Sequence, residues 1–280
     1  MNRCDWCLDD KCEKNGKCNC SECKLVNECY KFPRPTIRIT NKCTQECTHC
    51  CFESSPKSKV MMTLETALNV GKFLKSNEIP MIQVMGGEFF CNKQWYKILN
   101  ILVKRVKHMR LVTNGDWVAV KSVREKFAKF IDNNKDVLTI SLSFDKYHTN
   151  KHFEEAKAFL ENTGVRMTIG KGEEESDAIV PVGRGELHFT KYSMFNNYCY
   201  NPEKKYTFLI DEYGAIYKCA FGRWQYDTID DYLEGGFAQR FKEYNKKFYK
   251  VFIPNCKTCN RFACQYKGDK TLQHRTVAPI

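Results

Sequence analysis

Seventeen cysteines in 280 residues constrain the fold of this chain more than any other feature of its sequence. Fifteen of them fall in three groups: seven before residue 30, three from residue 43 to residue 50, and five after residue 198. The N-terminus lacks the apolar segment of a signal peptide, so we expect a cytoplasmic, reducing environment in which disulfides are rare. An odd number of cysteines also cannot pair completely. The grouping therefore predicts a metalloprotein.

Composition narrows the possible classes of function. Mean hydropathy is −0.54, and no stretch approaches the roughly 18 apolar residues of a membrane span, so a transmembrane helix is not expected. Hydrophobic residues make up 42%, which is enough for a folded core. The formal net charge is +12, and thiolate ligands to a metal would reduce it. The remaining positive charge would suit an acidic peptide or a nucleic acid.

Short apolar strands alternate with amphipathic helices from residue 36 to about residue 185. The predicted strands are 36–40, 81–85, 109–113, 137–143, 165–169 and 179–182. Helical stripes lie between them, the first capped by Thr63 and carrying Leu64, Ala67, Leu68 and Gly71 on one face. This alternation predicts βα units and a parallel sheet, so the fold class is α/β.

Two flanking regions differ from this alternating part. Residues 1–35 are rich in cysteine, poor in large apolar side chains, and end in a proline-containing stretch. After residue 185, segments 206–210 and 215–218 predict a hairpin, and an aromatic stripe from Phe241 predicts one more helix. We therefore divide the chain into a metal-binding segment (1–35), an α/β domain (36–185) and a small C-terminal domain with its own metal (186–280).

The central cysteine group directly follows the first predicted strand. Cys43, Cys47 and Cys50 are spaced to hold three irons of a 4Fe–4S cube from one loop. With no fourth ligand nearby, the fourth iron would be open to an exogenous ligand, and open positions are where metal chemistry occurs. Cys51 is interpreted as a spare thiol.

These residues resemble the radical S-adenosylmethionine (SAM) superfamily. The cysteine motif is followed at the end of the second strand by Gly86-Gly87-Glu88, although Phe89 stands where that family commonly has proline. Further motifs at later strand ends occur in the family's order: 111–115 (LVTNG), 143–145 (SFD) and 181–184 (PVGR). The resemblance implies a partial (β/α)6 TIM-like barrel over residues 36–185, with the active site at the C-terminal ends of the strands.

The resemblance also implies roles for individual residues. Cys43, Cys47 and Cys50 would ligate the catalytic 4Fe–4S cluster, whose open iron would bind the methionine part of SAM. The cluster would cleave SAM reductively, and the 5′-deoxyadenosyl radical would take hydrogen from a substrate. The expected SAM contacts are His49 against the adenine, Gly86, Gly87 and Glu88 at the amino group, and Ser143 and Asp145 at the carboxylate and ribose.

The C-terminal cysteines resemble the SPASM/twitch subgroup, which adds auxiliary Fe–S clusters to the barrel. The matching elements are Cys199, Gly214-x4-Cys219 and Cys256-x2-Cys259. These four cysteines would complete one auxiliary 4Fe–4S cluster, with Cys264 as an extra candidate ligand. A structural zinc site is the alternative.

The spacing of the N-terminal cysteines does not decide which metal they bind. Its spacings fit paired zinc ligands or a further Fe–S cluster equally well. Its members are Cys4, Cys7, Cys12, Cys18, Cys20, Cys23 and Cys29.

The expected function is a radical SAM enzyme acting on a peptide or protein, as in ribosomal peptide maturation, with a flavodoxin- or ferredoxin-type electron donor. The expected substrate rim carries aromatic and basic side chains, namely Tyr147, His148, Arg184, Phe221 and Arg223. One alternative is a radical dehydrogenase of a small sugar or alcohol, which the lack of an evident leader-binding domain before residue 36 favours. The other is a non-enzymatic Fe–S or zinc protein that binds nucleic acid, and Gly86-Gly87-Glu88 argues against it.

Overall fold

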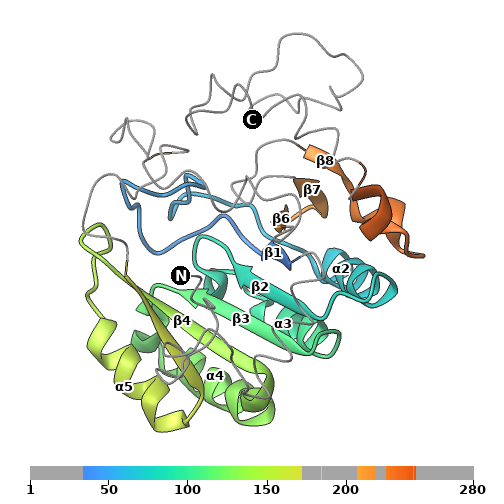
Figure 1. Cartoon of the computed structure of the whole chain (residues 1–280). Coiled ribbons are helices and arrows are strands. Elements are labelled where there is room, and N and C mark those ends of the chain that lie inside the picture. Colours follow the sequence, from blue (N-terminus) through green and yellow to red (C-terminus); the bar gives the residue numbers. More distant parts are fainter. Residues whose placement is uncertain (1–33, 172–183, 185–206, 218–224, 242, 244–280) are drawn as a thin grey trace, which may run out of the picture.

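Five parallel strands form the centre of the fold in the computed structural model, which describes residues 34–171, 184, 207–217, 225–241 and 243 (Figure 1). They lie side by side in chain order. Their bounds are β1 Arg34–Arg38, β2 Met81–Met85, β3 His108–Thr113, β4 Leu138–Phe144 and β5 Arg166–Lys171. The α/β class and these five strands are confirmed, whereas the strand expected at 179–182 lies outside the described residues.

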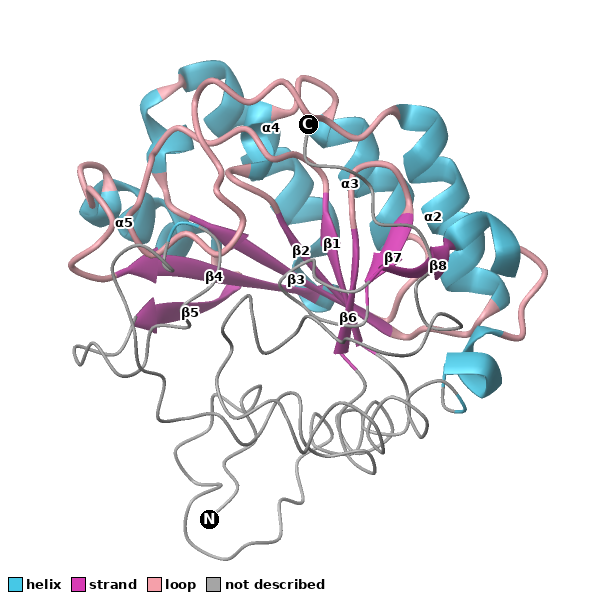
Figure 2. Ribbon diagram, turned by 90° about the horizontal axis from the view of Figure 1, so that it is seen from above, coloured by secondary structure: helices cyan, strands magenta, loops and turns pink. Residues whose placement is uncertain are grey.

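Four α-helices cover one face of this sheet, as Figure 2 shows. They are α2 (Leu64–Ser76), α3 (Trp95–Val103), α4 (Lys121–Asn134) and α5 (Phe153–Thr163). The predicted cap is confirmed, because the Thr63 hydroxyl accepts a hydrogen bond from the backbone N–H of Thr66 at 3.1 Å. Leu68 was wrongly expected in the core: it is 50% exposed, because the buried stripe runs through Ala67, Val70 and Leu74.

The two faces of the sheet differ in polarity. Apolar residues such as Ile82, Val84 and Leu111 belong to the core cluster under the helices. Since side chains alternate along a strand, their neighbours point to the opposite face. There a row of polar residues crosses five strands in register: Thr36, Gln83, Arg110, Thr139 and Arg166. The face away from the helices is therefore suited to polar ligands.

A hairpin from the C-terminal part of the chain extends the sheet beyond β1. Strand β6 (Thr207–Ile210) pairs in parallel with β1, and β7 (Ala215–Tyr217) and β8 (Gln225–Thr228) follow antiparallel. The resulting order is β5-β4-β3-β2-β1-β6-β7-β8. The predicted hairpin is confirmed, and its first strand is hydrogen-bonded directly to the strand that precedes the central cysteines.

Four short 3-10 helices lie among the described residues: η2 Phe89–Cys91, η3 Asp116–Ala119, η4 Lys135–Val137 and η7 Ile229–Tyr232. The helix predicted from Phe241 begins earlier, because residues 237–241 are already helical, and most of its later residues lie outside the described ranges. Within the described residues, no helix is both long and apolar enough to cross a bilayer.

Candidate functional site

The central cysteines lie on a long loop that leaves β1 and returns to α2. Asn92 holds the two ends of this loop together. Its side-chain amide donates to the backbone carbonyls of Ile39 and Met62, both at 2.9 Å. Asn92 is 2% exposed, so both bonds are shielded from water. Further in, the backbone N–H of Cys43 donates to the carbonyl of Ser55 at 3.1 Å. The loop is thus folded back on itself at the C-terminal edge of the sheet.

Two of the three thiols on this loop meet backbone N–H donors. The backbone N–H of Gln45 lies 3.4 Å from Cys43 Sγ, and that of Ser54 lies 3.4 Å from Cys50 Sγ. Burial raises the pKa of Cys43 to about 12 and that of Cys47 to about 11, and the neighbouring thiolates act in the same direction. Metal cations would therefore be needed to stabilise the thiolates, and three soft thiolate ligands on one loop suit iron–sulfur ligation.

The Gly86-Gly87-Glu88 turn packs directly against the start of the cysteine loop. The N–H of Gly87 donates to the Thr40 carbonyl at 2.8 Å, and that of Glu88 donates to the Lys42 carbonyl at 2.9 Å. A Cβ on Gly87 would lie 2.4 Å from the Lys42 oxygen, and one on Gly86 would lie 2.6 Å from the Thr40 oxygen. The glycines are thus required for backbone packing between two strand ends, a reason the sequence did not reveal.

Glu88 links the ends of β2 and β3. Its Oε2 accepts hydrogen bonds from the Thr113 hydroxyl at 2.9 Å and from the Asn114 N–H at 2.8 Å. Burial raises the pKa of Glu88 to about 7 in spite of these bonds. Its other oxygen, Oε1, is buried without a hydrogen-bond partner among the described residues. An amino group of a ligand is one donor that could satisfy it.

A second polar cluster joins the cysteine loop to the end of β4. The His49 ring lies 5.0 Å from the Tyr147 ring and 4.9 Å from the His148 ring. His49 Nε2 is 3.7 Å from Asp145 Oδ2, while His148 Nδ1 is 2.8 Å from Asp145 Oδ1.

Asp145 is held in its charged form. Burial alone would raise its pKa, but the His148 ring and the N–H of Tyr147 outweigh burial and lower the pKa to about 2. Burial lowers the pKa of His49, so the neutral imidazole is favoured. Although atoms of His49, Asp145 and His148 lie within 4.8 Å of one another, one pair is already hydrogen-bonded. The anionic Asp145 oxygen can accept a hydrogen bond from a ligand hydroxyl, and the neutral His49 ring can stack on a flat ring of a ligand.

The structure brings most of the predicted central residues to one edge of the sheet. The loop cysteines, His49, the Gly-Gly-Glu turn and Asp145 follow β1, β2 and β4, and Ser143 lies near the end of β4. Cys51 and Cys91 are free thiols. Other predicted residues lie outside the described ranges: Phe221, Arg223, and every cysteine of the N-terminal and C-terminal groups.

Three residues at the site had no predicted role. Asn114 Nδ2 donates to Thr44 Oγ1 at 2.9 Å and lies 3.8 Å from Cys43 Sγ. Gln45 donates to Asp116 at 3.0 Å and accepts from the N–H of Thr149 at 3.1 Å. Asn114 belongs to the 111–115 motif, which could have indicated it. Gln45 and Asp116 carry no comparable local pattern.

Comparison with known families shows to which superfamily the chain belongs. A sequence profile described as the radical SAM superfamily matches residues 37–179, which is half of the chain. The chain belongs to the radical SAM superfamily. The expected resemblance is confirmed at this level, and the chain is an enzyme for which SAM and a 4Fe–4S cluster are the implied cofactors. The residues around the central cysteines fit these groups in donor chemistry.

Two curated relatives from Bacillus subtilis (strain 168) share part of this domain. The chain is 34% identical over 116 residues to "Putative peptide biosynthesis protein YydG", covering 40% of this chain and 36% of that protein. It is 26% identical over 125 residues to "Antilisterial bacteriocin subtilosin biosynthesis protein AlbA", covering 44% of this chain and 27% of that protein. The matches thus span about a third of the length of these relatives.

Solved structures share the fold at low sequence identity. "Native anSMEcpe with bound AdoMet" aligns with a TM-score of 0.53 at 15% identity, covering 79% of this chain and 84% of that one. BtrN in complex with AdoMet and 2-DOIA aligns with a TM-score of 0.52 at 13% identity, covering 77% and 87%. The mostly parallel α/β architecture is therefore that of radical SAM enzymes.

Proposed function

We propose that this radical SAM enzyme modifies a peptide or protein, as in ribosomal peptide maturation. The observation that carries the site assignment is the packing of the Gly86-Gly87-Glu88 turn onto the cysteine loop, where the N–H of Glu88 meets the Lys42 carbonyl at 2.9 Å. The peptide substrate is supported by the two relatives, whose descriptions name peptide and bacteriocin biosynthesis. An electron donor of the flavodoxin or ferredoxin type belongs to the same proposal.

In this proposal Cys43, Cys47 and Cys50 hold the 4Fe–4S cluster. When bound, the cluster and SAM supply the radical that removes a hydrogen atom from the substrate. The N–H donors of Gln45 and Ser54 lie beside two of the three sulfur atoms and would offset their negative charge. Asn114 adds a side-chain donor near Cys43.

The proposed SAM contacts involve Glu88, Asp145, His49 and Ser143. Glu88 Oε1, buried without a partner among the described residues, would accept from the methionine amino group. Asp145 has one oxygen engaged by His148, which leaves Oδ2 toward His49 for the ribose hydroxyls. The His49 ring would lie against the adenine, and Ser143 would assist at the carboxylate or ribose.

We extend the proposal to an auxiliary 4Fe–4S cluster held by Cys199, Cys219, Cys256 and Cys259, with Cys264 as an extra candidate, in a twitch-like domain over residues 186–280. Gly214, which begins the Gly-x4-Cys pattern ending at Cys219, has φ +83° in the turn of the hairpin, a conformation that favours glycine. A Cβ there would also lie 2.9 Å from Ile229 Cδ1. Residues 1–35 are proposed as a separate segment that binds zinc or a further Fe–S cluster.

The first experiment compares two sets of cysteine variants of the anaerobically reconstituted protein. Replacing Cys43, Cys47 and Cys50 together by alanine should abolish conversion of SAM to 5′-deoxyadenosine. The matched control is Cys51→Ala, which removes an adjacent thiol and should leave the conversion intact. Undiminished cleavage in the triple variant would refute the assignment of these ligands.

The second experiment counts metals in the same triple variant. An auxiliary cube requires at least about four irons per chain, and this iron should fall when Cys219 is also replaced. If the triple variant contained zinc and no iron, the proposal of an auxiliary cluster would be refuted.

The third experiment follows deuterium from substrate into 5′-deoxyadenosine. Peptides deuterated at Cα or in the side chain should transfer the label. If they never do, while a deuterated sugar or alcohol does, the enzyme is a small-molecule dehydrogenase instead.

A further inference from the structure

Arg184 makes three hydrogen bonds to the cysteine loop, although it is more than a hundred residues away in sequence. Its Nη1 donates to the Cys47 carbonyl at 2.7 Å, and its Nη2 donates to the Ser54 carbonyl at 2.5 Å. Its backbone N–H donates to the Cys50 carbonyl at 3.0 Å. All three acceptors are backbone atoms of the segment that carries the second and third cysteines.

The backbone hydrogen bonds within this segment are longer than those from Arg184. The N–H of Cys50 reaches the Cys47 carbonyl at 3.2 Å, and the N–H of Glu53 reaches the Cys50 carbonyl at 3.3 Å. Charged donors form the stronger hydrogen bonds, so Arg184 contributes most to holding these carbonyls. The planar guanidinium spans Cys47 and Ser54, which fixes the distance between the two sides of the turn.

Ser54 connects this contact to a cysteine sulfur. Its backbone N–H lies 3.4 Å from Cys50 Sγ, and its hydroxyl donates to Asn41 Oδ1 at 2.8 Å. Ser54 is 1% exposed with Arg184 in place, so its carbonyl depends on the guanidinium as a donor. A displacement of Ser54 would therefore also displace the donor to Cys50.

We propose that Arg184 is a positioning residue that holds residues 47–54 in the conformation needed to ligate the cluster and whose positive charge favours the cluster's reduced state. This rests on the proposed function, because it takes Cys47 and Cys50 as cluster ligands. Reduction adds one negative charge to the cluster, and a fixed cation nearby stabilises that charge. The residue acts through the loop and needs no contact with SAM or substrate.

Two variants separate the positioning effect from the charge effect. Arg184→Lys keeps the positive charge but cannot span two carbonyls, whereas Arg184→Gln loses both properties. The matched control is Arg124→Gln, because Arg124 pairs on the surface with Glu155 at 2.9 Å, away from the loop.

The positioning effect is measured by hydrogen exchange on the full chain before cluster reconstitution. Peptides covering residues 47–55 should exchange at least roughly tenfold faster in both Arg184 variants, the effect of losing one hydrogen bond to a charged donor. Peptides covering β3 and β4 should be unchanged, as should every peptide of Arg124→Gln. Wild-type exchange rates in both Arg184 variants would overturn the proposal, whether or not the chain cleaves SAM.

The charge effect is measured as the midpoint potential of the reconstituted cluster. Reduction of Arg184→Gln should be roughly tenfold less favourable than that of wild type, about 59 mV more negative for one electron. Arg184→Lys should stay near the wild-type potential. Equal potentials in wild type and Arg184→Gln would overturn the electrostatic part. A wild-type chain that binds no iron would instead refute the proposed function, while the exchange result would still decide the positioning role.

Discussion

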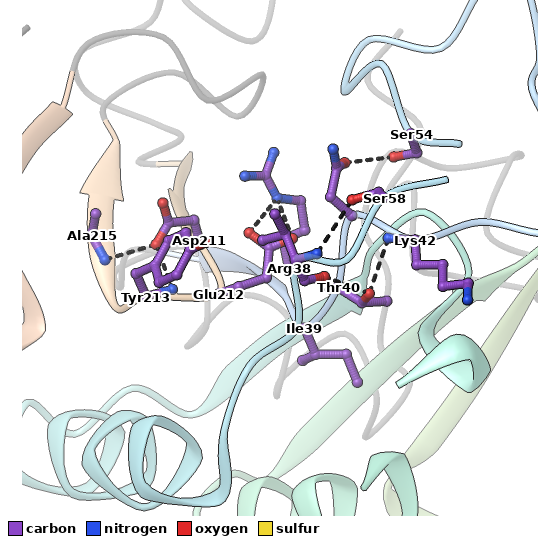
Figure 3. Close-up of polar contacts among 12 residues, drawn as sticks. Arg38, Ile39, Thr40, Lys42, Ser54, Ser58, Asp211, Glu212, Tyr213 and Ala215 are labelled. Atoms are coloured by element: carbon purple, nitrogen blue, oxygen red, sulfur yellow. Dashed lines mark hydrogen bonds and ion pairs between the residues drawn. The ribbon is translucent and has the colours of Figure 1, made fainter. Parts of the chain in front are cut away.

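Arg38 and Glu212 face each other across the junction between β1 and the C-terminal hairpin (Figure 3). Arg38 Nε lies 2.9 Å from one carboxylate oxygen of Glu212 and 3.0 Å from the other. Arg38 is the last residue of β1, and Glu212 lies in the turn between β6 and β7. The adjacent Asp211 orders the same turn by accepting hydrogen bonds from the N–H groups of Tyr213 and Ala215, both at 2.9 Å. The pair thus ties the hairpin to the strand that leads into the cysteine loop.

This pair predicts a pH dependence of stability. Burial raises the pKa of Glu212 from 4.5 to about 7, although Arg38 opposes the shift. Between these two values the folded chain keeps a proton that the unfolded chain releases, so the free energy of unfolding falls as pH rises through this window. At about 1.4 kcal/mol per pH unit, the fall due to Glu212 is about 3 kcal/mol.

Urea unfolding under anaerobic conditions between pH 4.5 and 8 tests this prediction. Glu212→Gln cannot titrate, so the stability of wild type relative to this variant should fall as pH rises to about 7 and then level off. Glu125→Gln, at a side chain that is 66% exposed, should track wild type at every pH. A pH-independent difference between wild type and Glu212→Gln would contradict the raised pKa.

Gly87→Ala should destabilise the fold and the site together. The added Cβ would lie 2.4 Å from the Lys42 oxygen and 2.8 Å from Cys43 Cβ, so the backbone must shift. We expect a loss of about 1–3 kcal/mol in the free energy of unfolding, the range for overpacked sites, and reduced cluster retention. In Gly170→Ala the nearest atom would be at 3.5 Å, an ordinary contact, and stability should change little. Equal effects of the two substitutions would argue against this packing role.

His148→Ala should weaken SAM binding more than it slows turnover. The ring holds Asp145 through the 2.8 Å contact at Oδ1, and its loss frees the carboxylate to rotate away from the ribose position. We expect the KM for SAM to rise roughly tenfold, equivalent to about 1.4 kcal/mol, with a smaller change in kcat. His152→Ala serves as control, because His152 faces the surface residue Glu155 at 3.6 Å. An unchanged KM in His148→Ala would show that Asp145 does not need this support.

Asn92→Ala should loosen the contact between the two ends of the cysteine loop. The substitution leaves two buried carbonyls, those of Ile39 and Met62, without their side-chain donor. We expect the free energy of unfolding to fall by about 2 kcal/mol, measured by urea denaturation. The control is Asn100→Ala, which removes only a bond to the Tyr96 carbonyl within α3 and should have little effect. Similar losses in both variants would contradict a special role for Asn92.

Local sequence patterns predicted most of the described secondary structure. The strand from Leu138 to Phe144 agrees with its expected position within a residue, and the Leu64–Ser76 helix begins directly after its predicted cap, Thr63. Periodicity succeeds here because one face of each element is buried against the core. It placed Leu68 wrongly, because one position along a helix rotates a side chain by about 100°, enough to leave the buried stripe.

Some features of the candidate site were evident in the sequence, and others were not. The spacing of Cys43, Cys47 and Cys50 and the Gly86-Gly87-Glu88 turn were evident in the sequence, because each is a short run whose chemistry depends on near neighbours. Three relationships were not evident in the sequence. They are the hydrogen bonds from Arg184 to the cysteine loop, the pairing of β6 with β1, and the contact between Arg38 and Glu212. By itself the sequence determined the elements, the cysteine motif and the superfamily. Only the tertiary structure decided which distant side chains support that motif, because such contacts depend on how the strands are ordered in the sheet and leave no fixed spacing along the chain.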